Sequence, residues 1–244
     1  MRRRSQMMRP GTSRDFDVLA ATWDAQHGPA SPRAPEFAAR VRYLRTVCRT
    51  CDRPHVLDLG CGTGQTLIHL ADVVERGIGI DSSPAMILKA RQNSPPASLR
   101  FQVGDAVEFC ASCPEGFDVI LLLGVLAHIQ DQGAVLAGAE RVLTPRSRLI
   151  VVSPHPWGPL FWLRRLLEGG RTAPPARHLA LFRLKQLASR HGLSLAAVRS
   201  LPYAAWPRLS AALSGSGKEA PPSARHPFAG VFRGAFAAEF RRSL

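Results

Sequence analysis

Three glycines at alternate positions follow directly on a short apolar run in the segment VLDLGCGTGQ, residues 56–65. The run His55–Leu59 has the length and apolar character of a buried parallel strand. Residues 65–74 then carry apolar side chains at helical spacing. The glycines therefore occupy a strand-to-helix turn, where missing Cβ atoms let a ligand approach the backbone and permit positive φ angles.

The charge beside this turn indicates which ligand it suits. The glycine spacing is GxGxG, whereas dinucleotide-binding turns read GxGxxG. Asp58 lies on the strand, two positions before Gly60. A carboxylate there repels a pyrophosphate and attracts a ligand that carries an ammonium and a sulfonium. On charge alone, the turn favours S-adenosylmethionine over NAD.

The same stretch resembles motif I of the class I S-adenosylmethionine-dependent methyltransferases, and further segments resemble that family in order. Residues 77–81 resemble the second strand, which ends in the acidic residue that holds the ribose hydroxyls. Residues 103–106 resemble the acidic segment beside the adenine amino group, and residues 125–131 the segment after the fourth strand in small-molecule members. Such members include methyltransferases of quinone, lipid and secondary-metabolite biosynthesis. The resemblance is close over residues 55–153.

The order of the expected elements agrees with this resemblance. Strands and helices alternate through Val152, which implies a parallel sheet with right-handed crossovers. The resemblance implies an α/β fold with a Rossmann-like, seven-stranded, mostly parallel sheet and helices on both faces. Val231–Phe240 is either the last strand or a closing helix. We expect a disordered basic lead-in over 1–14 and one methyltransferase domain over 15–244. The expected parts of this domain are an N-terminal helical cover (15–50), a cofactor-binding core (55–153), an apolar and basic lid insert after strand five (154–178) and C-terminal strands with a mobile loop (179–244).

The resemblance assigns cofactor contacts to the glycine turn and to the segments after it. A carboxylate at Asp81 would accept two hydrogen bonds from the ribose diol, while the adjoining Ser82–Pro84 would also suit the start of a helix. Asp105 would contact adenine or cap the next helix, and Met86 would line the adenine pocket or pack in the core. The full expected set is Asp58, Gly60, Cys61, Gly62, Gly64, Asp81, Ser82, Met86, Asp105, Ala106 and Gly124.

Candidate bases are histidines that follow the central strands. Methyl transfer from a sulfonium is an in-line displacement in which the protein aligns the nucleophile, excludes water and in some cases removes a proton. Ligands bind at the carboxyl ends of strands in an open α/β sheet. His128 and His155 follow strands four and five, and His27 in the N-terminal cover is a weaker candidate. The alternative for His128 is a packing or capping role at the next helix.

The insert after strand five carries the information about the acceptor. It combines Trp157, Phe161 and Trp162 with Arg164 and Arg165. This composition suits a cover over an apolar acceptor or a helix at a lipid interface, and the alternative is packing on its own core or on a second subunit. We expect a small, apolar acceptor that is methylated at oxygen rather than nitrogen or carbon, with peripheral membrane contact as an additional hypothesis.

The net charge of +14 invites a nucleic-acid interpretation. The basic residues are scattered rather than set in one stripe. RNA amino-group methyltransferases of this fold often carry an Asn/Asp-Pro-Pro-aromatic segment after strand four, where this chain has Leu123–Leu126. Nucleic acid is therefore not favoured. Methylation of RNA or protein is the second hypothesis, and a binding module without chemistry is the third.

Cysteine usage bears on the compartment and on metal binding. Cys48–Cys51 and Cys110–Cys113 are CxxC pairs that precede strands one and four. Since those strands are neighbours in this fold, the pairs could meet and hold zinc, or form disulfides in an exported protein. Four independent thiols are the favoured interpretation, and no metal is assigned. Because no secretory signal or transmembrane run is recognised, we expect a reducing, cytoplasmic setting.

Overall fold

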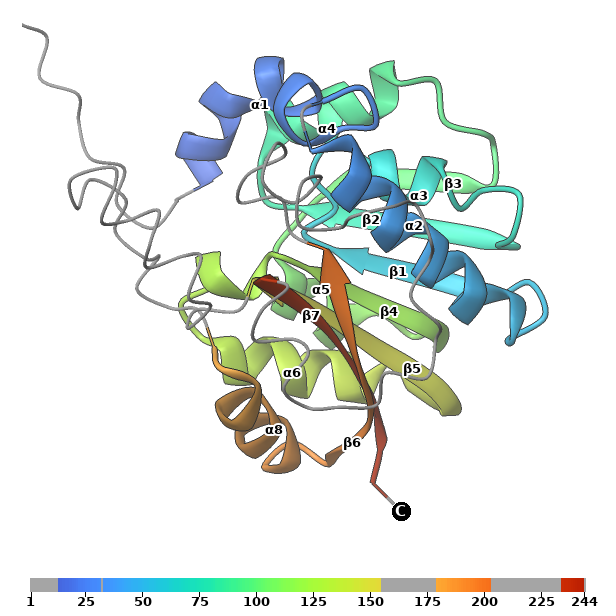
Figure 1. Cartoon of the computed structure of the whole chain (residues 1–244), viewed down its shortest axis with the longest axis vertical. Coiled ribbons are helices and arrows are strands. Elements are labelled where there is room, and N and C mark those ends of the chain that lie inside the picture. Colours follow the sequence, from blue (N-terminus) through green and yellow to red (C-terminus); the bar gives the residue numbers. More distant parts are fainter. Residues whose placement is uncertain (1–12, 32, 155–178, 203–233, 244) are drawn as a thin grey trace, which may run out of the picture.

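The structure is a computed structural model that describes residues 13–31, 33–154, 179–202 and 234–243. One seven-stranded sheet runs through it in the order β3-β2-β1-β4-β5-β7-β6 (Figure 1). β7 pairs antiparallel with β5 and β6, and the remaining pairs are parallel, which confirms the expected Rossmann-like sheet. The strands are β1 (His55–Leu59), β2 (Arg76–Asp81), β3 (Leu99–Val103), β4 (Phe117–Leu123), β5 (Leu143–Pro154), β6 (Leu193–Pro202) and β7 (Gly234–Arg242).

Helices cover both faces of the sheet, as expected. In Figure 1, α1 and α4 lie together above the sheet, and α6 and α8 lie below it. The helices above are α1 (Ser13–His27), α2 (Ala34–Arg49), α3 (Gln65–Ile68) and α4 (Pro84–Gln92). Those packed on the other face are α5 (Ala106–Ser112), α6 (Gln132–Arg141) and α8 (Leu181–Ser189), and the short helix η1 (Leu126–His128) follows β4.

Two apolar clusters hold these layers together. Successive side chains of a strand point to opposite faces, so Val119 and Leu121 of β4 join the cluster under α2 and α4. Ile120 and Leu122 join the other cluster, with side chains of α5, α6 and α8. Burial on both faces explains why the central strands read as unbroken apolar runs.

The helix expected over residues 65–74 is shorter in the structure. α3 ends at Ile68, and tight turns follow, with Leu70 N donating to Leu67 O at 2.9 Å. At this point Arg45 Nη1 of α2 donates to the His69 carbonyl at 3.0 Å. The alternative left open near the C-terminus is resolved, because Gly234–Arg242 is a strand.

The hypothesis that the two CxxC pairs meet is wrong. Cys48 ends α2 and belongs to the cluster on one face of the sheet, whereas Cys110 in α5 belongs to the cluster on the other. The helices before β1 and β4 cover opposite faces although the strands are neighbours. Burial raises the pKa of Cys48 and of Cys110 to about 12, so both are protonated at neutral pH. Among the described residues all five cysteines are free, and no group of three or more His, Cys, Asp or Glu could hold a metal ion.

Several expectations concern residues outside the described ones. These are the lead-in up to residue 12, the lid insert from His155 onward with its aromatic and arginine residues, and the loop expected over Ala211–Arg225. The end of β5, the end of β6 and the start of β7 lie side by side, since Pro154 of β5 pairs with Ala235 and Pro202 of β6 with Gly234. No helix within the described ranges is long and apolar enough to cross a membrane.

Candidate active site

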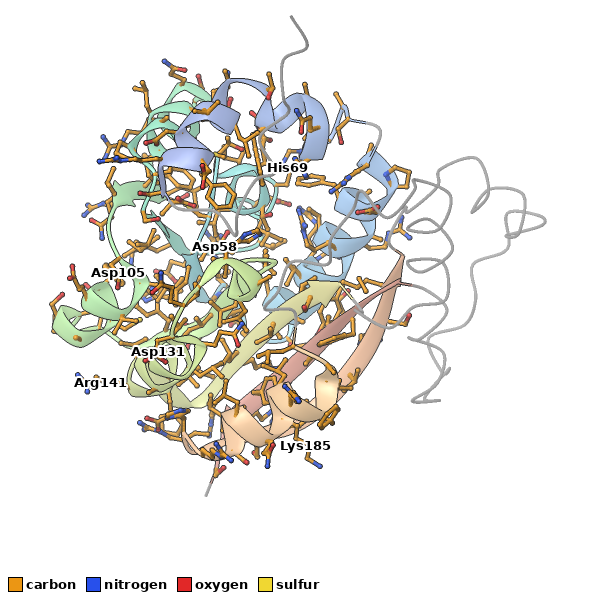
Figure 2. The ribbon with its side chains drawn as sticks, turned by 90° about the vertical axis from the view of Figure 1, so that its left-hand side faces the viewer. Asp58, His69, Asp105, Asp131, Arg141 and Lys185 are labelled. Carbon is orange, nitrogen blue, oxygen red and sulfur yellow. The ribbon has the colours of Figure 1, made fainter. Side chains whose placement is uncertain are left out.

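A cavity of about 860 Å³ opens at the carboxyl ends of the central strands. Figure 2 shows Asp58 near the centre of the molecule, with Asp105 and Asp131 between it and one edge. α1, the start of α2, the glycine turn and η1 all contribute to the cavity wall. The residues expected from the sequence that line it are Asp58, Gly60, Cys61, Gly62, Asp81, Ser82, Met86, Asp105, Ala106, Gly124 and His128. His155 lies outside the described residues.

The three glycines of the turn share positive φ angles but differ in what surrounds them. A Cβ at Gly60 would lie 2.4 Å from Val125 Cγ2, and one at Gly64 would lie 2.6 Å from Phe101 Cζ. Gly62 faces the cavity, where its nearest neighbour would be Trp23 Nε1 at 3.5 Å. Gly64, which was expected to contact the cofactor, does not line the cavity. It allows the turn to pack closely on Phe101 of β3.

Gly60 and Gly124 offer a matched pair of substitutions, because both have φ +78°. A Cβ at Gly124 would meet nothing within 4 Å, so Gly124→Ala should cost only backbone strain of about 1 kcal/mol. Gly60→Ala adds the clash with Val125 and should lower the free energy of unfolding by about 3 kcal/mol or more. Urea unfolding followed by circular dichroism measures both, and equal losses would contradict this account.

Asp81 organises the glycine turn as well as the cavity floor. Its Oδ2 accepts from Gly62 N at 2.8 Å, and its Oδ1 accepts from Ser83 N at 2.9 Å. Burial raises the pKa of Asp81, and these two N–H groups oppose the rise. Ser83 is itself the N-cap of α4, accepting from Met86 N at 3.2 Å. The expected helix therefore begins beside the carboxylate that ends β2, and the contact of Asp81 with a ribose stays a prediction.

Asp58 and the half-buried Arg40 place opposite charges at the cavity. Asp58 is 1% exposed, and its Oδ1 has no hydrogen-bond partner among the residues that the structure describes. Burial raises the pKa of Asp58 to about 7; Arg40 opposes that rise, and Asp81 adds to it. Arg40 Nε is likewise buried without a partner, and burial lowers the pKa of this guanidinium. Unpaired buried polar atoms are costly, so this arrangement indicates a site for a zwitterionic ligand.

Sequence reasoning missed Arg40. The signal was present, because Phe37, Val41 and Leu44 form the buried stripe of α2, and Arg40 interrupts that stripe at a position spaced for burial. An arginine on an apolar helical face needs an explanation, since cations are rarely buried unless they are paired.

Asp105 and Met86 show the structural roles that were considered for them as alternatives. Asp105 Oδ1 accepts from Val107 N at 2.8 Å and from Glu108 N at 3.1 Å, which caps α5. The Met86 side chain is 2% exposed and packs in the protein. Both residues nevertheless line the cavity, so neither role excludes contact with a bound ring.

Aromatic rings of α1 and the imidazole of His128 line part of the cavity. His128 packs edge-to-face on Phe16 of α1, with ring centroids 5.1 Å apart. Although part of the His128 ring is open to the cavity, the surrounding protein lowers its pKa by desolvation, so the imidazole is neutral near pH 7. Trp23 lies beside Phe16, and His27 stacks on Trp23 at 4.1 Å. Apolar side chains of β4 to β7 also line the cavity: Leu123, Val152, Leu201 and Ala235.

Comparisons with known proteins agree with this geometry. The ubiquinone biosynthesis O-methyltransferase of Azorhizobium caulinodans is 30% identical over 149 residues, covering 56% of this chain and 58% of that protein. The chain spans about three fifths of the length of the curated relatives it matches.

Solved structures share the fold. The N-methyltransferase NodS from Bradyrhizobium japonicum, in complex with S-adenosyl-L-homocysteine, superposes with a TM-score of 0.63 at 17% identity, over 94% of this chain and 97% of that one. The magnesium protoporphyrin IX methyltransferase from Synechocystis PCC 6803 gives 0.60 at 17% identity, over 84% and 82%. A family model described as a methyltransferase domain matches residues 52–174, half of the chain. The chain therefore belongs to the methyltransferase domain family.

Proposed function

We propose that the protein transfers a methyl group from S-adenosylmethionine to a small, apolar acceptor. The observation that carries this proposal is the pair formed by Asp58 and Arg40. The amino-acid end of the donor bears an ammonium and a carboxylate, and each would meet a group of opposite charge that otherwise lies buried with an unpartnered atom. Binding of the donor would therefore remove a desolvation penalty that the empty site retains.

The remaining contacts follow the shape of the donor. The carboxylate of Asp81 lies at the end of β2 with its oxygens directed at the turn, where a ribose diol would complete its hydrogen bonding. The adenine ring would extend between Met86 and Asp105, which line the next part of the cavity wall. The donor supplies the sulfonium, and this chain supplies the charged groups that hold it.

The acceptor would occupy the aromatic and apolar end of the cavity. His128 lies there with its imidazole neutral, in the state that a general base requires. In the proposed reaction, the acceptor oxygen forms its bond to the methyl carbon as the carbon–sulfur bond breaks, neutral S-adenosylhomocysteine leaves, and His128 takes the hydroxyl proton. The name of the Azorhizobium relative, an O-methyltransferase, supports oxygen as the acceptor atom. The role considered for His155 stays a prediction.

Calorimetry and labelled methyl transfer test this function. The purified protein should bind S-adenosylhomocysteine with a dissociation constant in the micromolar range and should ignore NADH. Labelled methyl groups should then enter the small-molecule or lipid fraction of a lysate. Label found only in RNA or protein would replace this acceptor with the alternative one, and NADH binding without S-adenosylhomocysteine binding would end the proposal.

Two further expectations belong to the same proposal. Residence in the cytoplasm fits the five free cysteines of the described residues, because thiols persist in a reducing compartment. Contact with a membrane surface through residues 154–170 stays a prediction from the apolar and basic composition of that segment.

A further inference from the structure

Helix α1 carries three aspartates, and two of them, Asp17 and Asp24, lie seven residues apart in the sequence. Seven residues are about two helical turns, so both side chains project from the same face. The hydrogen bonds of both carboxylates go to segments that build the cavity. The contacts differ in one respect that can be tested: Asp17 uses one of its oxygens, and Asp24 uses both.

Asp24 ties α1 to the glycine turn and to the end of α4. Its Oδ1 accepts from Thr63 Oγ1 at 2.5 Å, and its Oδ2 accepts from Gln65 Nε2 and Asn93 Nδ2, each at 3.2 Å. Asn93 Nδ2 also donates to the Thr63 carbonyl at 3.1 Å, which closes the network. Asp24 therefore fixes Thr63, the residue between Gly62 and Gly64.

Asp17 reaches the start of α4. Its Oδ1 accepts from Ser83 Oγ at 2.5 Å and from Ala85 N at 3.1 Å. Ser83 N in turn donates to Asp81 Oδ1 at 2.9 Å. One residue, Ser83, thus separates Asp17 from the carboxylate proposed to hold the ribose, and the Asp17 charge contributes to raising the pKa of Asp81.

Ring contacts such as that of Phe16 with His128 add to these bonds, but few side chains of α1 are buried. Ala20 is the one buried residue of this helix, so burial of apolar surface contributes little to its docking. Hydrogen bonds to carboxylates are shorter and stronger than neutral ones. Trp23 lies over Gly62, so the position of α1 also decides how well the turn is covered.

We propose that Asp17 and Asp24 are positioning residues that fasten α1 across the cofactor cavity, and that Asp17 acts through Ser83 on Asp81. This inference rests on the proposed function, because the ligand that it concerns is the methyl donor. Detachment of α1 exposes the glycine turn, so these bonds limit how fast a bound cofactor leaves.

Comparing the asparagine and alanine variants at positions 17 and 24 tests how many carboxylate oxygens each position needs. Asp17→Ala should weaken S-adenosylhomocysteine binding about tenfold or more, through faster dissociation. Asp17→Asn should remain within about threefold of wild type, because an amide oxygen can accept the same two bonds. Asp24→Asn should fall between wild type and Asp24→Ala, since its amide oxygen can accept from Gln65 and Asn93 while its NH₂ group can donate only to the Thr63 hydroxyl. Val18→Ala, at a position 81% exposed on the same helix, is the matched control.

Calorimetry and stopped-flow dissociation on the whole protein measure these effects, and thermal melting verifies that each variant is folded. If Asp17 acts through Ser83, Asp17→Ala combined with Ser83→Ala should weaken binding no more than the stronger single change. Wild-type affinity in Asp17→Ala, equal losses in Asp17→Asn and Asp17→Ala, or fully additive losses in the double variant would overturn the inference and leave the proposed function intact.

Failure of the wild-type protein to bind S-adenosylhomocysteine would instead end the proposed function. Amide hydrogen exchange of the free protein reports on the fastening itself in either case. Exchange in α1 should be faster in Asp17→Ala than in wild type and should return to the wild-type rate in Asp17→Asn. Unchanged exchange in Asp17→Ala would contradict the fastening.

Discussion

Asp81→Asn should weaken binding of S-adenosylhomocysteine by about 100-fold or more. Each carboxylate oxygen of Asp81 already accepts one backbone N–H, from Gly62 and from Ser83. An asparagine places an NH₂ group against one of these donors, which leaves a buried N–H unpaired and disturbs the turn. It also removes one of the two acceptors proposed for the ribose diol, and sites built to hydrogen-bond a ligand lose much affinity when a partner is missing.

Asp118→Asn is the matched control for this change. Asp118 Oδ2 accepts from His55 N at 2.9 Å, which is the same kind of carboxylate-to-backbone bond. It lies at the amino ends of β1 and β4, away from the cavity. Titration calorimetry should show wild-type affinity in this variant. Binding by Asp81→Asn within threefold of wild type would contradict the role proposed for Asp81.

Cofactor affinity should fall about eightfold between pH 7.5 and pH 6. The pKa of Asp58 is about 7 in the free protein, and in the proposed function the ionised form would bind the cationic end of the donor. Raising the pH through the pKa increases the ionised fraction and hence the affinity; lowering it requires the ligand to displace a proton. The comparison stops at pH 7.5 because an α-amino group loses its own proton at about pH 8.

Asp58→Asn isolates this contribution. The imidazoles of His27 and His128 also line the cavity, and desolvation places their pKa values below the ordinary 6.5. With Asp58 replaced, affinity at pH 7.5 should drop at least tenfold, because the Arg40 charge then faces the ammonium without compensation. The remaining change between the two pH values should be less than twofold. An unchanged pH profile in Asp58→Asn would assign the titration to another group.

Local sequence patterns predict the fold and part of the candidate site. The apolar runs, the glycine turn and the acidic end of β2 are encoded within a few residues each, and all of them lie where the sequence places them. The apolar spacing predicted a longer α3, but the backbone after Ile68 continues in tight turns, which this spacing does not distinguish from a helix. The alternative that the two CxxC pairs meet followed from the adjacency of β1 and β4. The strand order does not reveal that the helices before these strands pack on opposite faces of the sheet.

Long-range partners account for the parts of the site that sequence reasoning left out. Arg40 and Asp58 lie 18 positions apart, and only the packing of α2 on the sheet brings their charges to one cavity. The contacts from Asp17 to Ser83 and from Asp24 to Asn93 span 66 and 69 positions. A hydrophobic pattern shows which face of α1 docks, but it contains no information about which polar groups that face will meet.

The raised pKa of Asp58 affects the lifetime of the ligand-free protein in a cell. Without a cationic ligand, the buried carboxylate stabilises partly unfolded states in which it regains water. The ligand-free protein should therefore unfold locally more often than the donor-bound protein. Proteases act on opened chains. The abundance of this protein in a cell would then follow the supply of methyl donor, with copies that remain empty removed first.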